Sequence, residues 1–407
     1  MNKVTDRMKT VLMKEVADDC RFFLGDRPCI WHKREGVVCT CERYQPIRER
    51  VLVIKLDAMG DVLRTTSLLP PLAAAHPGAA ITWVTRAESV PLLENNPYLT
   101  EIVTYGIDTL VHLGARRFDR VINMDAGKIS AGLATLARGT RTDGFVLHEL
   151  GHVVATNPAA QAWLETGIND HLKRAGMRTY QQWMRDILAV PDVPDAYVLD
   201  LRAEECAAGR QHLTDLGVDF TRPIVGLNTG AGGRWELKQW REDGFLELMA
   251  RLGGEMGAQF VLLGGPGERD RNTRLQRTAA VPVIDPGCTN PVRHFAALTG
   301  CCDVVVTGDT LAMHIALALG RRTVVLFGPT SAPEIELYGL GEKVVPDMTC
   351  LSCYKMTCDF VPNCMDLISV DMVASAVRRQ LAAVPAGRLA HVSVPAGVTA
   401  MATEPRA

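Results

Sequence analysis

The sequence predicts an α/β protein built from doubly wound parallel sheets in two domains. Short apolar runs of strand length alternate with stretches that repeat apolar residues at helical spacing. Glycine-rich turns follow several of these runs, and such alternation is typical of parallel strands joined by crossover helices. The length of 407 residues allows two domains of about 100–200 residues each.

Composition gives no reason to expect a nucleic-acid or membrane-surface partner, because the formal net charge is only −2. No apolar run approaches the ~18–20 residues that span a bilayer. The N-terminus, Met-Asn-Lys-Val-Thr-Asp-Arg, lacks the apolar core of a secretion signal. We therefore expect a cytoplasmic protein without a transmembrane segment.

Cysteine is abundant, with 12 residues in the chain. In a reducing compartment these thiols are expected to be free, catalytic or metal-bound rather than paired in a disulfide framework. Four lie in residues 20–41 and four in residues 350–364. The scattered ones are expected to pack as small apolar side chains: Cys206, Cys288, Cys301 and Cys302.

Residues 1–48 read as a Cys-rich N-terminal arm with too few apolar residues for a core of its own. Its cysteines are separated by eight, nine and one residues, which matches no zinc-ribbon pattern. The arm must either hold a metal or dock on the body of the protein. A metal site would use Cys20, Cys29, Cys39 and Cys41.

A first domain is expected at residues 49–215. It opens with an apolar strand at 51–55, a turn at 56–61 and a helix over 62–75. Asp61 would stand at the mouth of this first crossover, where a carboxylate can take a proton from a hydroxyl held in the cleft. The same position suits an N-cap of the helix, so both interpretations stay open.

His148-Glu-Leu-Gly-His152 matches the H-E-x-x-H signature of zinc proteases. That chemistry needs both imidazoles on one face of a regular helix, with Glu149 as the base. Gly151 and the Thr-Asn-Pro stretch ending at Pro158 oppose such a helix, and no third ligand follows in the expected form. A chance match in a loop is the preferred interpretation.

Residues 159–189 are predicted to be helical. They would either shape an acceptor pocket or form a solvated helix pair with aromatic core contacts. They are rich in aromatic and cationic residues, among them Trp163, Lys173, Arg174, Arg178, Tyr180 and Trp183.

A Pro-rich stretch at 191–195 and a polar helix at 202–216 lead to a second domain, expected at residues 216–383. Its first strand, 223–228, is followed by a loop of small residues, including Thr229 and Gly230. Such a loop lets the backbone approach a phosphorylated ligand, and Lys238 supplies a cation there.

The next strand of this domain, 258–265, is followed by Glu268. A carboxylate at a strand end suits a ribose diol in a nucleotide site. A helix cap is an equally good interpretation of Glu268.

Residues 304–328 form the clearest βαβ unit, with Gly308, Asp309 and Thr310 in the turn after the first strand. Helix N-termini at this edge of a parallel sheet bind anions, phosphate above all. Thr310 is a candidate N-cap, and His314 lies one turn into the helix. An ordinary capped helix in an α/β core is the alternative.

The second cysteine cluster has spacings of two, four and five residues. Four thiols so close together in a reducing compartment favour a structural iron or zinc site. Its ligands would be Cys350, Cys353, Cys358 and Cys364. A helix is predicted at 367–383, and residues 384–407 are predicted to be a disordered tail.

Four motifs together resemble those of the glycosyltransferase family 9 heptosyltransferases, over residues 50–380. The first is Val51-Leu-Val-Ile-Lys-Leu-Asp-Ala-Met-Gly-Asp-Val-Leu-Arg-Thr-Thr, and the second runs from Asn228-Thr-Gly-Ala to Lys238-Gln-Trp240. The third runs from Leu262-Leu-Gly-Gly to Glu268, and the fourth from Gly308-Asp-Thr through His314 to Ala318-Leu-Gly.

The resemblance implies a GT-B fold, in which two Rossmann-like domains face each other across a cleft. It also implies an inverting transfer from an ADP-sugar, expected to be ADP-heptose, without a catalytic metal. Asp61 then matches the base, Lys238 the cation on the donor pyrophosphate and Glu268 the ribose ligand. The phosphate-binding turn matches Asp309, Thr310 and His314.

The chain also departs from the family pattern. Leu311 stands where many members have Gly, and the arm before Val51 is absent from the lipopolysaccharide core enzymes. The 350–364 cysteines resemble the iron-binding finger of the autotransporter heptosyltransferases, which form large rings, so a homo-oligomer is possible. The acceptor is left open between a glycan, a protein Ser/Thr and a small molecule. A nucleotide-sugar-binding protein without activity and the zinc protease remain the alternatives.

Overall fold

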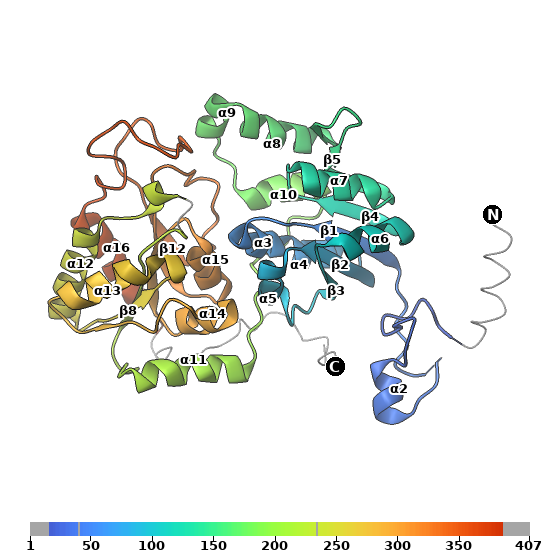
Figure 1. Ribbon diagram of the computed structural model, residues 1–407, viewed down its shortest axis with the longest axis horizontal. Coiled ribbons are helices and arrows are strands. Elements are labelled where there is room, and N and C mark those ends of the chain that lie inside the picture. The colour runs from blue at the N-terminus through green and yellow to red at the C-terminus, as the bar shows by residue number, and fades with distance from the viewer. Residues whose placement is uncertain (1–15, 40, 233–234, 386–407) are drawn as a thin grey trace.

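A computed structural model describes residues 16–39, 41–232 and 235–385 of the chain. It contains two six-stranded sheets, each with helices on both faces (Figure 1). The strands of the first sheet are β1 Glu49–Ile54, β2 Ala79–Thr85, β3 Leu99–Thr104, β4 Phe118–Asn123, β5 Gly139–Leu147 and β6 Val153–Ala155. Those of the second are β7 Ile224–Asn228, β8 Gln259–Leu263, β9 Val283–Ile284, β10 Val304–Gly308, β11 Arg322–Leu326 and β12 Gly341–Val344.

The two sheets share one topology. The strand order is β3-β2-β1-β4-β5-β6 in the first and β12-β11-β10-β7-β8-β9 in the second. All pairs are parallel except β5 with β6. In both sheets the order reverses beside the first strand, at β1/β4 and at β7/β10. Open parallel sheets bind ligands at the carboxyl ends of the strands at such switch points.

The apolar runs become strands because both faces of each sheet are covered. Residues 51–54 of β1 and 304–306 of β10 are all fully buried. Residues buried on both sides need no polar alternation, so continuous apolar runs are expected in parallel strands. Two clusters of apolar side chains pack on opposite faces of the first sheet, around Trp83 and around Phe118.

The helix predicted over 62–75 is divided in two. It forms α3 Met59–Thr65, a short 3₁₀ turn, and α4 Leu69–Ala75. Pro70 and Pro71 lie in the first turn of α4, where the missing N–H groups cost nothing. The other helices of this half are α5 Val90–Leu93, α6 Ile107–Ala115, α7 Lys128–Leu136, α8 Pro158–Ile168, α9 Asp170–Ala175 and α10 Tyr180–Leu188.

The second half contains α11 Ala203–Asp215, α12 Glu242–Met256, α13 Arg269–Thr278, α14 Val292–Gly300, α15 Leu311–Ala318 and α16 Val370–Ala382. Here the predicted helix at 202–216 agrees with α11 to within a residue at each end. The helix predicted at 367–383 begins later, at Val370, because Ser369 is its N-cap and accepts a hydrogen bond from Met372 N.

The H-E-x-x-H match is not helical, so the zinc-protease interpretation is wrong. His148 and His152 lie in the hairpin between β5 and β6, where His148 N donates to His152 O at 2.9 Å and Gly151 N donates to His148 O. Gly151 has φ +82°, a conformation that favours glycine and ends any helix. The two imidazoles stack on each other, with ring centroids 4.6 Å apart.

Over its described residues, 16–39 and 41–48, the N-terminal arm contains one short helix, α2 Ile30–Glu35, and projects from the start of β1 away from both sheets (Figure 1). Residues 1–15 of the arm, and residues 386–407 of the predicted tail, lie outside the described part of the chain. Within that part, no helix is both long and apolar enough to cross a membrane.

Candidate active site

A cavity of about 850 Å³ lies between the two sheets. Its walls are the turns that follow β1, β7, β8, β10 and β11, together with residues of α8, α9 and α10. The N-terminal residues of α3 and α15 both line it, and the two helices, which pack against each other, lie between the sheets in Figure 1. The cavity thus joins the switch points of the two domains.

The N-terminus of α15 faces the cavity with its backbone N–H groups free of a side-chain cap. Thr310 occupies the predicted N-cap position, but its side chain makes no capping hydrogen bond. Instead its Oγ1 accepts from Asn228 Nδ2 at 3.2 Å and contacts Thr307 Oγ1 at 3.1 Å. Leu311 and Ala312, the first two residues of the helix, line the cavity. The arrangement suits an anion such as phosphate.

Lys238 and Asp309 form an ion pair beside this helix end. Lys238 Nζ lies 3.1 Å from Asp309 Oδ2 and 3.0 Å from the Asp309 carbonyl oxygen. Burial raises the pKa of the Asp309 carboxyl, but Lys238, then His314 and Arg64, together lower it overall. Both residues line the cavity, so a charged ammonium is held next to the helix N-terminus.

Glu268 is almost fully buried, and its carboxylate is held by two loops. Oε2 accepts from Gly265 N at 2.8 Å and Oε1 accepts from Gly232 N at 3.1 Å. A Cβ at Gly230 would lie 2.2 Å from the Glu268 carboxylate, so only glycine permits this approach. Glu268 caps its own turn and also lines the cavity, so the two interpretations of this residue are compatible.

Two of the predicted donor residues do not line the cavity. The Thr229 hydroxyl points into the core and donates to Asn272 Oδ1 at 2.6 Å. Gly308 ends β10 and is buried beneath the Lys238 segment. Thr229 and Gly308 therefore support the loops and do not present a group to a ligand. Gly230, Lys238, Glu268, Asp309, Thr310 and His314 do line the cavity.

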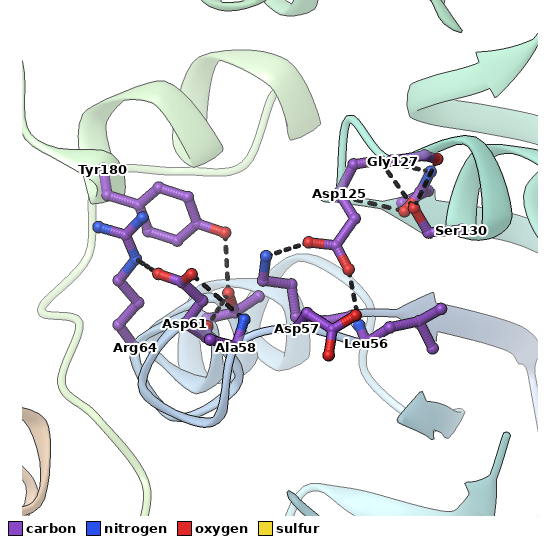
Figure 2. A network of polar contacts seen from close by, with 12 residues as sticks. Leu56, Asp57, Ala58, Asp61, Arg64, Asp125, Gly127, Ser130 and Tyr180 are labelled. Atoms are coloured by element: carbon purple, nitrogen blue, oxygen red, sulfur yellow. Dashed lines mark hydrogen bonds and ion pairs between the residues drawn. The ribbon is translucent and has the colours of Figure 1, made fainter. Parts of the chain in front are cut away.

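Asp61 faces these groups from the opposite domain. Helix α3 begins at Met59, so Asp61 is its third residue and not the N-cap, and its Oδ2 accepts from Ala58 N at 3.3 Å. Arg64 Nε lies 2.8 Å from Oδ1 (Figure 2). Burial raises the pKa of the Asp61 carboxyl, but Arg64, then Lys55 and His314, hold it well below its usual range.

Arg64 connects the two domains and was not predicted from the sequence. Its Nη1 donates to Glu334 Oε1 at 2.9 Å, and its guanidinium lies 4.0 Å above the Tyr180 ring. Glu334 comes from the loop after β11, in the other domain. The two residues are 270 positions apart, so no sequence pattern could have paired them.

A second charged pair lies beneath Asp61. Lys55 is buried at the end of β1 and pairs with Asp125, whose Oδ2 also accepts from Leu56 N at 2.6 Å (Figure 2). Burial lowers the pKa of Lys55, but Asp125, then Tyr180 and Asp61, raise it overall. A lysine directly after a buried apolar run was the sequence signal for this pair, because such residues are seldom buried unpaired.

His314 lies between the two halves of the site. Burial, followed by the charge of Arg64, lowers the pKa of its imidazole to about 4, so the ring is neutral at pH 7. A Cβ at Gly60 would lie 2.8 Å from His314 Cδ2, so glycine permits the close approach of α3 and α15. Among the described residues, nothing bonds His314 Nδ1.

The opposite wall of the cavity is aromatic and cationic. Trp163, Lys173, Arg178 and Trp183 come from α8 to α10 or the turns beside them and line it. Lys173 Nζ lies 3.4 Å above the ring of Tyr354, which belongs to the 350–364 loop. The helical segment therefore contributes a wall of the cavity, rather than being only a solvated helix pair.

The 350–364 loop lies against the turn after β11. Ser352 N donates to Gly328 O, and Tyr354 N donates to Pro329 O. All four cysteines are free, and the pKa of the Cys364 thiol is raised to about 11 by burial, then by Cys353 and Cys358. Over the residues that the structure describes, no three side chains are placed to hold a metal ion. The thiols have the chemistry of an iron or zinc site but not its geometry.

Comparison with known proteins gives one consistent family. The model of glycosyltransferase family 9 (heptosyltransferase) matches residues 110–363. Lipopolysaccharide heptosyltransferase 1 of Pseudomonas aeruginosa is 24% identical over 335 residues, covering 77% of this chain and 88% of that protein. A crystal structure of the glycosyl transferase family 9 protein from Veillonella parvula has a TM-score of 0.67 at 20% identity, over 83% of this chain and 98% of that chain.

A more distant match is TibC from enterotoxigenic E. coli H10407, described as an iron-containing dodecameric glycosyltransferase. Its TM-score is 0.52 at 13% identity, over 83% of this chain and 77% of that chain. A second TibC structure is a complex with ADP-D-β-D-heptose.

Proposed function

Because the chain belongs to glycosyltransferase family 9 and is a GT-B glycosyltransferase, we propose that it transfers a heptose from an ADP-linked donor to an acceptor hydroxyl, with inversion. The observation that carries the proposal is that Asp61 of one domain and the uncapped N-terminus of α15 of the other line the same cavity. TibC, of the same fold, has been seen with ADP-D-β-D-heptose.

The donor half would bind the nucleotide. The pyrophosphate would accept hydrogen bonds from the first N–H groups of α15 and from Lys238 Nζ, and the ribose hydroxyls would donate to Glu268. These groups are already aimed at the place where charge grows on the leaving phosphate. One such preorganised donor can be worth ~3–4 kcal/mol in the transition state.

The acceptor half would supply the nucleophile. As the acceptor oxygen bonds to the anomeric carbon, the bond from that carbon to the phosphate oxygen breaks, and ADP leaves with the electron pair. The hydroxyl proton passes to the Asp61 carboxylate. A carboxylate with a depressed pKa is a weak base, so the proton moves late, when the oxygen is already acidified by bonding to a carbon of oxocarbenium character.

Fully ionised Asp61 has a second use. Its charge faces the anomeric carbon as positive charge develops there. Lys173 and Arg178 on the opposite wall would bind an acceptor that carries negative charge, while Trp163 and Trp183 offer apolar ring faces to sugars. The chemical identity of the acceptor scaffold is not part of the proposal.

The cysteines of the 350–364 loop would hold a structural iron or zinc ion. Four thiols suit either metal, and the loop would have to tighten for them to meet one ion. Through Tyr354, which contacts Lys173 and Glu334, such an ion would rigidify one wall of the cavity. TibC is described as a dodecamer. Mass photometry of the metal-loaded protein would measure whether this chain also forms an oligomer.

The donor is tested by thermal unfolding with ADP, ADP-heptose, UDP and GDP. A ligand that binds only the folded protein at ~100 times its Kd adds about 2.7 kcal/mol to the free energy of unfolding. We expect stabilisation by ADP and ADP-heptose only. A preference for UDP or GDP would leave the family assignment intact and overturn the heptose donor.

The base is tested with Asp61→Asn. We expect sugar transfer to fall ~10²–10⁴-fold, while the thermal shift by ADP is kept, because the nucleotide lies in the other domain. Asp57→Asn is the matched control. Asp57 is four residues earlier, pairs with Arg86 at 2.8 Å and does not line the cavity. Equal activity of wild type and Asp61→Asn would exclude Asp61 as the base.

A further inference from the structure

The N-terminal arm contains a second cavity, remote from the active site. Its volume is about 340 Å³, and all four cysteines of the arm line it. Cys20, Cys29, Cys39 and Cys41 are each partly exposed, and none of them forms a disulfide. His32 lines the same cavity. Five soft or borderline metal donors within 22 residues of chain thus face one space.

The arm has no apolar core that would explain its fold. None of the described residues between 16 and 48 is buried. Its contacts are polar or at ring edges. They include one backbone bridge between Cys20 and Pro46, the edge contact of Phe22 with Trp31 at 5.7 Å, Arg43 over the Trp31 ring and paired with Glu35, and hydrogen bonds. Units below about 40 residues seldom fold alone without disulfides or a metal. The arm has no disulfide among its described cysteines, so a bound metal is the remaining cross-link that could stabilise its fold.

His32 carries the second observation. Its Nδ1 lies 2.9 Å from the carbonyl oxygen of Val37, so Nδ1 donates in this contact and Nε2 is the ring nitrogen left to face a metal. Metal-binding histidines are oriented in this way, with the remote ring nitrogen bonded to a carbonyl or carboxylate. The same imidazole also lines the cavity that the four thiols line. A hydrogen bond at the end of a helix would not by itself require that position.

The spacing of the donors selects four of the five. Cys29 and His32 are separated by two residues, and Cys39 and Cys41 by one. Tetrahedral zinc sites also use two close pairs joined by a loop, usually with about two to four residues within a pair; Cys29 and His32 fit that spacing, and Cys39 and Cys41 are one residue closer. Cys20 lies eight residues before Cys29 and its backbone belongs to the bridge with Pro46, so it is the donor least able to move.

We infer that the arm is a zinc-binding module in which Cys29, His32, Cys39 and Cys41 hold one ion. In the described conformation no three of these side chains stand at ligand distances. Binding therefore draws the half-exposed thiols inward and closes the cavity, since a metal site is seldom preformed without its ion. The module is separate from the 350–364 loop and from sugar transfer.

The test measures bound zinc per chain in the full-length protein. Protein stripped of metal and kept reduced is titrated with zinc alone against a chromophoric chelator, and bound metal is counted by mass spectrometry. The double variant Cys39→Ser/Cys41→Ser is expected to bind one zinc ion fewer per chain. His32→Ala is expected to weaken the affinity for that ion at least ~10-fold. Cys20→Ser, in the same cavity, and Cys206→Ser, in α11, are expected to bind like wild type.

Two results would overturn the inference. One is an unchanged zinc count in the double serine variant, with all bound metal lost only on mutation of Cys353 and Cys358. The other is loss of the equivalent in Cys20→Ser but not in His32→Ala, which would replace His32 by Cys20. Limited proteolysis provides an independent readout, because cleavage within residues 16–48 should accelerate on zinc removal while ADP still stabilises the body of the protein.

Discussion

At the scale of single residues, the site depends on Arg64. This side chain contacts Asp61 in its own domain and Glu334 in the other. It is also the largest charge effect that lowers the pKa of Asp61. Closure of the domains and ionisation of the proposed base are therefore linked through one guanidinium.

Arg64→Gln is expected to lower kcat/KM and to change its pH dependence. The wild-type carboxyl has a depressed pKa, so it stays ionised and causes no loss of activity as pH falls through the mildly acidic range. Without the Arg64 charge the pKa of Asp61 rises, and the acidic limb of kcat/KM moves to higher pH. The profile of kcat/KM against pH for wild type, Arg64→Gln and Arg64→Lys measures the shift.

Arg64→Lys is the control that keeps a positive charge, and it should retain most of the wild-type acidic limb. Glu334→Ala separates the two functions of Arg64, since it removes the acceptor on the other domain and leaves the pair with Asp61. If Arg64→Gln lost activity but kept the wild-type acidic limb of the kcat/KM profile against pH, Arg64 would act on the arrangement of the domains alone.

At the scale of elements, short turns at strand ends position most of the side chains that line the active site. The turns after β7, β8 and β10 meet at the N-terminus of α15. Each depends on close packing of backbone rather than on long side chains. Gly230 and Glu268 show this most clearly, because a Cβ at Gly230 would overlap the Glu268 carboxylate.

Gly230→Ala is expected to displace Glu268 and weaken nucleotide binding. Two hydrogen bonds to the ribose at about 0.5–1.5 kcal/mol each correspond to a loss on the order of 10-fold in affinity. Isothermal titration with ADP measures it. Gly267→Ala is the matched control in the neighbouring turn, where an added Cβ meets no atom within 4 Å. Equal ADP affinity in the two variants would show that Glu268 does not bind the ribose.

At the scale of the whole molecule, the two domains share one apolar cluster. It includes Leu63 and Leu92 from the first half, Tyr197 from the connecting segment, and Met313 from the second half. Arg293 reinforces it from α14. Its guanidinium donates to Glu205 and to the carbonyl oxygens of Pro91 and Asp200, at 2.5–2.8 Å.

Arg293→Met is expected to destabilise the protein by about 3 kcal/mol, because it leaves the partly buried Glu205 and two carbonyl groups without their donor. Arg378→Met is the control, since Arg378 forms a more exposed pair with Glu255 on the surface, and such pairs contribute about 0–1 kcal/mol. Chemical unfolding of both variants measures the difference. Similar stabilities would mean that the Arg293 contacts do not hold the domains together.

The sequence by itself determined the α/β class, most of the strands and helices, and the turns of the site. These depend on local chemistry. Apolar runs form buried strands, and glycine and threonine mark the turns. The same local reasoning failed for His148 and His152, since it was the hairpin between β5 and β6, not the motif, that set their geometry. It also missed the break in the first helix at Thr66–Leu68.

Only the tertiary structure decided which side chains meet. Lys55 pairs with Asp125 across 70 residues, and Arg64 with Glu334 across 270. Thr229, predicted to face the donor, bonds Asn272 in the core instead. Periodicity and turn chemistry act over a few residues, whereas these contacts join segments that are far apart in the chain. Lys55–Asp125 and Thr229–Asn272 depend on how strands and helices meet within one domain, and Arg64–Glu334 depends on how the two domains are packed against each other.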